Sequence, residues 1–324
     1  MDDDSHENVV PGSDESLDTP DVHGYEFRDG VDFQELLASY ATTGFQATAL
    51  AEAVDIAERM QEADATTYLT CTSNIVSSGL REVVAALVRE GYVDVLITTS
   101  GALTEDVIKT QKPFKMGSWN ADEAALREQG INRLGNIFVP SNRYVWLEEY
   151  LYDFFDDFFA EEKTRTPTAF ARELGATLDD ENSVLKQAND NDVPVYCPAL
   201  TDAEVGNFLY YYRQSYDPDV DIALLDDYET LIEGGMDADT TGLIAVGDGV
   251  PKHHAIMTNL FRGGADYAIY ISTGMEGDGS LSGAPPTEAV SWGKIKADER
   301  NYTQIQAEAT LVFPLLVAGA FFEN

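Results

Sequence analysis

The chain has 324 residues, with 58 Asp and Glu against 20 Lys and Arg and a formal net charge of −38. Such a surface repels nucleic acid and anionic lipid, so we expect neither as a direct partner. Hydrophobic residues make up 44% of the chain, which is enough for a folded core, and the length allows one large domain or two ordinary ones.

The acidic residues are spread along the chain rather than gathered in one tail. Diffuse acid with little lysine suits molar salt, where the screening length is about 3 Å. We therefore expect a halophile that accumulates salt in its cytoplasm; the alternative is a mesophilic protein with a basic partner. No apolar run has the length of a membrane span, and the start does not resemble a secretory signal. Cys71 and Cys197 lack framework spacing, which favours free buried thiols in a cytoplasmic protein.

In chain order, the first segment is an acidic arm. Residues 1–22 lack apolar periodicity and should be flexible, whereas residues 23–324 are expected to form one domain. Two helical faces follow, near residues 36–40 and 47–57. The segment 144–159 is apolar around much of its circumference, so it should be buried or lie at a subunit contact. Strands are predicted at residues 67–71, 93–98, 192–196, 241–246 and 266–271, and further helices at residues 79–89, 203–212, 252–261 and 310–322.

Short strands that alternate with helices predict an α/β fold with a doubly wound, mostly parallel, Rossmann-like sheet. Ligands of such sheets bind beyond the carboxyl ends of the strands. The distinctive polar clusters of this chain follow predicted strands, at residues 72–78, 99–105, 201–207, 247–254 and 272–280.

Two of these clusters are candidate cofactor sites. Residues 72–79 follow a strand and open a helix, so their backbone N–H groups can bind a pyrophosphate. The run is not G-x-G-x-x-G, and the alternative is a plain loop in which Ser77 or Ser78 caps the helix. Residues 98–101 are small and let a ligand approach the backbone. Glu105 then holds a ribose hydroxyl or an ammonium group, or only compensates the helix dipole.

Adjacent histidines and one lysine are candidates for chemistry. His253 and His254 cannot both face one site from a helix, because neighbouring positions point about 100° apart. We expect no metal site, since no ligand cluster stands nearby. Lys294 follows a Gly- and Pro-rich loop; a buried lysine can lose its proton and attack a carbonyl or imine carbon, whereas the alternative is a surface lysine packed on Trp292. Glu288 and Trp292 share a helical face and can hold an organic ammonium.

These motifs match a known family. The chain resembles deoxyhypusine synthases from about Gly24 to the C-terminus. The most specific match is Glu-Ala-Val-Ser-Trp-Gly-Lys at residues 288–294, joined by Lys-His-His at 252–254 and Thr-Ser-Asn at 72–74. Other matching stretches are residues 28–31, 42–47, 93–101, 132–139, 198–202, 263–267 and 311–317.

The resemblance implies an NAD-dependent enzyme that oxidises a polyamine, normally spermidine. The aminobutyl part would pass as an imine to Lys294 and then to one lysine of the precursor of translation initiation factor 5A, where NADH reduces the imine to deoxyhypusine. The resemblance also implies a homotetramer with sites at a subunit interface. The alternatives are transfer to a small amine, as in homospermidine synthases, and a catalytically silent NAD-binding paralogue.

The site residues carried over by motif form three sets, for catalysis, polyamine binding and NAD binding. His253 would accept a proton from the amine being oxidised, and Lys294 would be the covalent carrier. The polyamine contacts fall on Glu105, Asn207, His253, Gly279, Ser280, Glu288 and Trp292. The NAD contacts fall on Ser73, Asn74, Ile75, Val76, Ser77, Thr99, Ser100, Gly101, Glu105, Asp202, Asp248, Thr273, Gly274, Glu308 and Ala309.

This chain departs from the family pattern at several positions. Thr104, Asn207 and Leu281 stand where the family carries acids. Asp248 replaces a glycine and Glu308 an aspartate. Fewer carboxylates weaken the case for spermidine, because buried ammonium groups need pairing. A related amine with a different end group, such as the guanidinium of agmatine, is the alternative donor.

Overall fold

The centre of the molecule is a six-stranded parallel sheet. In a computed structural model, which describes residues 19–297 and 301–322, the strand order is β11-β10-β9-β1-β2-β7. From β1 the chain first adds β2 and β7 on one side, and then β9, β10 and β11 on the other side. The strand order therefore reverses between β1 and β9. This topology confirms the predicted doubly wound α/β fold. The strands are β1 (Thr66–Cys71), β2 (Val95–Ile97), β7 (Val195–Tyr196), β9 (Thr241–Val246), β10 (Tyr267–Ile271) and β11 (Tyr302–Ile305).

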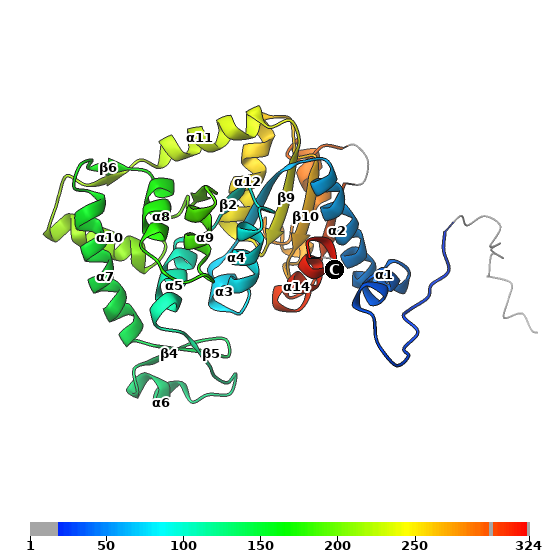
Figure 1. Ribbon diagram of the computed structural model, residues 1–324, viewed down its shortest axis with the longest axis horizontal. Helices are drawn as coiled ribbons and strands as arrows, with labels where there is room; N and C mark the ends of the chain where they lie inside the picture. Colours follow the sequence, from blue (N-terminus) through cyan, green and yellow to red (C-terminus); the bar gives the residue numbers. More distant parts are fainter. Residues whose placement is uncertain (1–18, 298–300, 323–324) are drawn as a thin grey trace, which may run out of the picture.

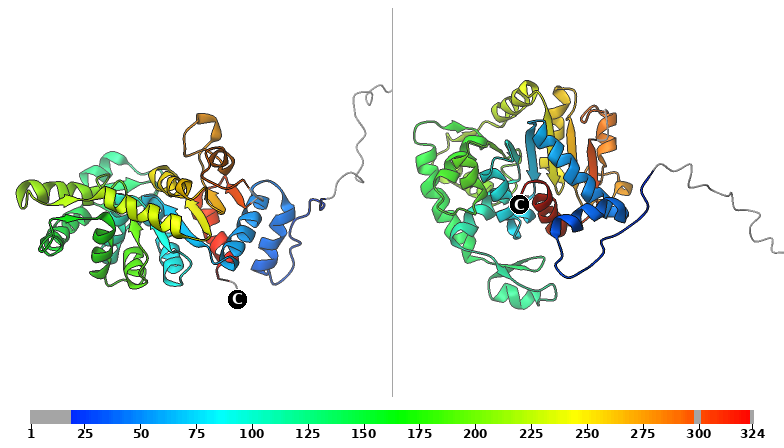
Figure 2. Two further views of the ribbon diagram at one scale, coloured as in Figure 1. Left: turned by 90° about the horizontal axis from the view of Figure 1, so that it is seen from above. Right: turned by 45° about the vertical axis from the view of Figure 1, so that its right-hand side comes forward.

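Both faces of this sheet are buried, which explains why its strands are almost continuously apolar. Alternate residues enter two separate cores: Leu69 and Ile244 belong to one, and Tyr68 and Leu243 to the other. Helices α2 (Phe45–Glu62) and α14 (Ala309–Ala320) cover the first face, as Figure 2 shows in its right-hand view. Helix α12 (Gly249–Phe261) covers the second.

The remaining elements surround this frame. Helices α7, α8 and α10 gather beyond the β7 edge of the sheet, and the β4–β5 hairpin projects from that side with α6 (Figure 1). The short strands are β3 (Lys115–Met116), β4 (Ile131–Leu134), β5 (Ile137–Pro140), β6 (Thr164–Arg165) and β8 (Asp221–Ile222). The other helices are α1 (Phe33–Thr43), α3 (Ser73–Ser77), α4 (Arg81–Arg89), α5 (Ser100–Gln111), α6 (Glu123–Glu128), α7 (Asn142–Phe158), α8 (Pro167–Ala176), α9 (Val184–Asp190), α10 (Glu204–Ser215), α11 (Leu224–Asp237) and α13 (Pro286–Ser291).

The apolar segment predicted at 144–159 forms α7. Its side chains Leu147, Leu151, Phe154, Phe155 and Phe158 are buried within the chain itself, whereas Val145 is exposed. Phe155 contacts Phe170 and Tyr212, with ring centroids 6.1 and 5.2 Å apart. Phe158 packs edge-on against the same Phe170 ring at 5.5 Å. Burial inside the subunit is therefore the alternative that the structure supports for these residues.

The division into an arm and one domain stays a prediction. Residues 1–18 of the expected arm lie outside the described part of the chain, and residues 19–22 are exposed. Within the described residues, no helix combines the length and the apolar character that a bilayer crossing requires.

Candidate active site

A first cavity, of about 350 Å³, lies where the strand order reverses. Open parallel sheets bind ligands at this point, beyond the carboxyl ends of their strands. Six of the predicted NAD contacts line it, namely Asn74, Ile75, Asp248, Thr273, Glu308 and Ala309. The other lining residues are Thr72, Gly247, Gly249, Ile271, Ser272 and Ala307.

Glycine allows the strand ends around this cavity to come close together. Gly247 has φ +81°, and a Cβ there would lie 2.9 Å from Oγ1 of Thr72. A Cβ on Gly101, in the first turn of α5, would lie 2.9 Å from Cβ of Ser73. The starts of α3 and α5 are therefore in direct contact, which brings the two predicted cofactor motifs together.

Three buried polar atoms that follow the carboxyl ends of β2 and β9 lack a hydrogen-bond partner among the described residues. They are Oγ1 of Thr99, Oγ of Ser100 and Oδ1 of Asp248. Buried polar groups normally form hydrogen bonds, and unpaired ones need an explanation. Hydroxyls and a carboxylate in this position fit the hydroxyl- and phosphate-rich surface of a dinucleotide, so the residues present are compatible with NAD.

Glu105, on α5, contacts the last residue of α3. Oγ of Ser77 donates a hydrogen bond to its carboxylate. Burial raises the pKa of Glu105 to about 7, against the opposing effects of Ser77 and Lys109. The other predicted cofactor contacts do not line the 350 Å³ cavity. Val76 and Gly274 are next to lining residues in the chain, whereas Asp202 is exposed in the segment before α10.

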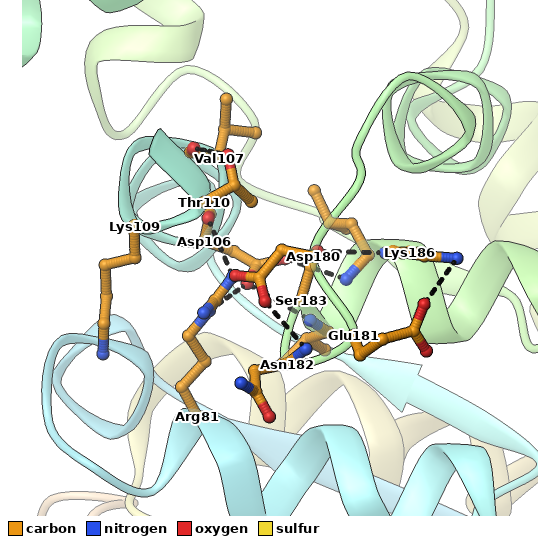
Figure 3. Close-up of polar contacts among 12 residues, drawn as sticks. Arg81, Asp106, Val107, Lys109, Thr110, Asp180, Glu181, Asn182, Ser183 and Lys186 are labelled. Carbon is orange, nitrogen blue, oxygen red and sulfur yellow. Dashed lines mark hydrogen bonds and ion pairs between the residues drawn. The ribbon is translucent and has the colours of Figure 1, made fainter. Parts of the chain in front are cut away.

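A buried ionic network joins α5 to α4 and to the segment that precedes α9 (Figure 3). Asp106 accepts hydrogen bonds from Nε of Arg81 at 2.6 Å and from Oγ of Ser183 at 2.8 Å. Arg81 also donates to Asp180 at 2.9 Å. One turn further along α5, Nζ of Lys109 donates to the carbonyls of Val76 and Ser78, each at 2.8 Å. These bonds fix the end of α3 to α5.

A second cavity, of about 510 Å³, lies beside α12 and α13. Five predicted substrate or catalytic residues line it together: His253, Gly279, Glu288, Trp292 and Lys294. Its other lining residues are Lys252, Ile256, Met257, Leu260, Tyr270, Leu281, Ala284, Pro285 and Ala289.

The end of α13 sets the position of Lys294. Gly293 has φ +70°, its N–H donates to the carbonyl of Val290, and the N–H of Lys294 donates to that of Ala289 at 2.9 Å. This is a Schellman motif, which glycine permits at the left-handed position. The carbonyl of Lys294 then accepts a hydrogen bond from Ala265 at 3.0 Å. The Lys294 backbone is consequently fixed at both its N–H and its carbonyl.

Two buried lysines face this cavity, and their surroundings differ. Nζ of Lys252 donates to the carbonyls of Leu281 at 3.1 Å and Ala284 at 3.2 Å. No hydrogen bond or ion pair to another described residue is found for Nζ of Lys294, which lies 5.3 Å from the ring centroid of Trp292. A nucleophile needs an accessible lone pair, so Lys294 is the better candidate of the two.

The structure separates the two adjacent histidines. His253 lines the 510 Å³ cavity, and its pKa is lowered by burial and by the nearby charge of Lys294. His254 points elsewhere: its ring lies 5.0 Å from that of Tyr228, and burial lowers its pKa to about 4. A neutral imidazole beside a lysine can accept a proton, and only His253 is placed to do so.

Three predicted substrate contacts are not brought to this cavity. Glu105 and Asn207 are on α5 and α10, and Ser280 is adjacent to lining residues without being one of them. Glu288 is the one carboxylate among the described lining residues, and Leu281 adds an apolar side chain. Within one subunit, the cavity can therefore pair one ammonium group directly.

Sequence reasoning missed Lys252 and Tyr270 as parts of this cavity. The hydroxyl of Tyr270 is buried without a partner among the described residues. Lys252 stood inside the Lys-His-His motif, but the motif could not show whether it faced solvent or the cavity. The signal for Tyr270 was weaker still, because it is one of several large residues in a buried strand.

Comparisons with known proteins identify the family of this chain. The family model described as deoxyhypusine synthase matches residues 35–320. The chain is 79% identical to the "Probable deoxyhypusine synthase" of Halobacterium salinarum, over 98% of this chain and 97% of that protein. It is 45% identical to the protein of the same name from Thermococcus gammatolerans, over 95% and 96% of the two chains.

A crystal structure of a "putative deoxyhypusine synthase" from Entamoeba histolytica has the same fold. It superposes with a TM-score of 0.69 at 27% identity and covers 93% of this chain and 97% of its own. The high identity to the Halobacterium protein supports the expectation that this chain comes from a haloarchaeon. The chain belongs to the deoxyhypusine synthase family, a family of transferases.

Proposed function

We propose that this protein transfers an aminobutyl group from a polyamine, through an imine on Lys294, to a lysine of the precursor of translation initiation factor 5A. The observation that carries the proposal is the position of Lys294 in the 510 Å³ cavity, with Nζ unpaired among the described residues and His253 and Glu288 in the same wall. The family membership of the chain supports this chemistry.

The residues of the cavity divide the work. Glu288 pairs with an ammonium group of the donor, and the Trp292 ring flanks its alkyl chain. His253 accepts the proton that the donor amine releases on oxidation, and the Lys294 amine attacks the resulting imine carbon. NAD, held by residues of the 350 Å³ cavity such as Asp248 and Glu308, would accept a hydride from the donor and return it to the imine that is left on the acceptor lysine.

The acceptor then takes the place of the departed donor fragment. Its lysine amine attacks the carbon held by Lys294, and the Lys294 amine is released for another cycle. In line with the family, we propose that the protein works in the cytoplasm as a homotetramer. The donor is a polyamine that one carboxylate of this cavity can hold, either spermidine or a related amine.

Mass spectrometry of the purified precursor tests the proposal. The protein, in molar KCl with NAD, is incubated with the precursor and either labelled spermidine or labelled agmatine. We expect a mass gain on one precursor lysine, dependent on NAD and on one of the donors. Label appearing in a small amine product instead would favour the homospermidine-type reaction. No NADH formation with any amine would favour a silent NAD-binding protein and contradict the proposal.

A further inference from the structure

The loop between β10 and α13 forms one wall of the 510 Å³ cavity, which we call the amine cavity, because Gly279, Leu281 and Ala284 line it. The loop folds back on itself through two close backbone contacts. A Cβ on Gly283 would lie 2.0 Å from the carbonyl oxygen of Met275, and a Cβ on Gly274 would lie 2.8 Å from that of Ser282. Compact loops of this kind are frequently functional, but they need anchors to the body of the protein.

Lys252 is such an anchor. Its ammonium group lies under the loop and donates to the carbonyls of Leu281 and Ala284, at 3.1 and 3.2 Å. The same nitrogen is 4.2 Å from the ring centroid of Tyr270. The residue is only 1% exposed. Burial of an unpaired ammonium is costly, so these carbonyls and the ring face are what makes this position tolerable for a lysine.

The contacts of Lys252 also reach the cofactor side. Nζ lies 4.0 Å from Oδ1 of Asp248, which lines the 350 Å³ cavity. The other oxygen of Asp248 accepts a hydrogen bond from Oγ of Ser272 at 2.7 Å, and Oγ of Ser272 accepts one from the N–H of Gly274 at 2.8 Å. Both ends of the loop are thus tied to one group of residues at the boundary between the two cavities.

We propose that Lys252 is a positioning residue that fixes this loop, and with it the wall of the amine cavity, to the turn of the cofactor cavity. It forms no covalent bond with the substrate: its donors are used by the loop, whereas Lys294 carries the group. The consequence for catalysis rests on the proposed function, but the anchoring itself does not.

The test compares three variants with the wild type. Lys252→Met keeps the length of the side chain and removes the ammonium, and Lys252→Arg keeps charge and donors. Lys186→Met is the matched control, because Lys186 lies on α9 and pairs with Asp190, away from both cavities. The first readout is hydrogen exchange at the amides of Gly283 and Ala284, which bond to carbonyls within the loop.

We expect exchange at these two amides to be at least about tenfold faster in Lys252→Met, and unchanged in Lys186→Met. KM for the donor should rise at least about tenfold, more than kcat falls, because a displaced wall weakens positioning. Borohydride trapping should still label Lys294 in this variant. Lys252→Arg should restore slow exchange at least in part, and it carries the test if the methionine variant does not fold.

Some results would overturn the inference. Unchanged exchange in a folded Lys252→Met protein would show that the loop does not depend on the ammonium. An unchanged donor KM would remove the role in positioning, and a trapped adduct on Lys252 would make it a nucleophile instead. If the wild type turned over no amine at all, the proposed function would fail, while the exchange measurement would still decide the anchoring role.

Discussion

Two basic side chains, Arg81 and Lys294, are buried in different regions of the molecule, and they differ in whether an acidic partner is buried with them. Arg81 is 3% exposed and lies against Asp106, which is 1% exposed and also accepts bonds from Ser183, Val184 and Leu185 (Figure 3). Lys294 is 8% exposed, and its Nζ has no such partner among the described residues. A buried charge with all its bonds satisfied holds the structure together. A buried amine without them is available for chemistry.

The largest effect should come from the unsatisfied amine. Lys294→Arg should reduce turnover at least about 10⁴-fold, since a guanidinium cannot form the imine. The free energy of unfolding should change by less than about 1 kcal/mol, because Nζ forms no hydrogen bond or ion pair with a described residue and a guanidinium can keep the contact with the Trp292 ring. Labelled donor with borohydride and a urea titration measure the two quantities. Lys296→Arg, which keeps its ion pair with Asp266, is the control; retained labelling in Lys294→Arg would refute the role.

Replacing Arg81, whose charge is paired, should have the opposite result: a large loss of stability and a small effect on activity. Arg81→Met leaves Asp106 buried without its cation and should cost about 3–5 kcal/mol of stability. Residual activity per folded molecule should survive, since neither residue lines either cavity. Chemical denaturation in molar KCl gives the loss. A change below about 1 kcal/mol would mean that water or relaxation compensates the charge.

The two adjacent histidines provide a comparison between a residue that lines the 510 Å³ cavity and one that does not. His253→Gln should lower kcat about 10²- to 10³-fold, as expected for loss of a general base. The pKa of His253 is lowered from its ordinary value, so wild-type kcat/KM should fall below that pKa and be flat above it. His254→Gln is the matched control, because that ring packs against Tyr228 and does not line the cavity. Equal losses in the two variants would argue against a specific role of His253.

Glu105 offers a test by pH. Burial raises its pKa to about 7 from the ordinary 4.5, so the folded state holds this proton more tightly than the unfolded state. The corresponding stability is complete below pH 4.5 and is lost as the pH rises through 7. The wild type should lose up to about 3 kcal/mol more than Glu105→Gln across this range. Parallel pH–stability curves for the two proteins would show that Glu105 is not buried as described.

The smallest effect belongs to an exposed ion pair. Arg172 and Asp192 lie 2.5 Å apart with side chains 64% and 78% exposed. Arg172→Met should change stability by less than about 1 kcal/mol, and by less still in molar salt, because water and ions screen the pair. Thermal melts at low and high KCl provide the measurement. A loss as large as that of Arg81→Met would contradict the view that burial decides the outcome.

Much of the fold could be predicted from the sequence because the central strands are apolar and bounded by clear turns. The strand predicted at 241–246 is confirmed as β9, and the one at 67–71 is β1 with one more residue. The strands predicted at 93–98 and 192–196 are shorter in β2 and β7, since only part of each run pairs with a neighbour. β11, at the edge of the sheet, was missed because it is only four residues long and its two middle residues, Thr303 and Gln304, are polar.

The site was predictable where a motif is local and not where it depends on side-chain direction. Residues 288–294 form a single helix end, so Glu288, Trp292 and Lys294 reach one cavity together. Glu105 and Asn207 come from separate helices, and spacing alone could not show which cavity they would face. The role of Lys252 required knowledge of two carbonyls about 30 residues away.

The helix end that carries Lys294 has a consequence for the order of events. The N–H and the carbonyl of Lys294 both form backbone hydrogen bonds, so Nζ moves by rotation about the side-chain bonds while the backbone stays in place. In the proposed reaction, a group attached to Nζ would therefore stay in the 510 Å³ cavity from its transfer off the donor to its transfer onto the acceptor. On this proposal the donor and the acceptor occupy that cavity one after the other, and the remainder of the donor leaves before the acceptor binds. Turnover should accordingly follow double-displacement kinetics with respect to the two amines.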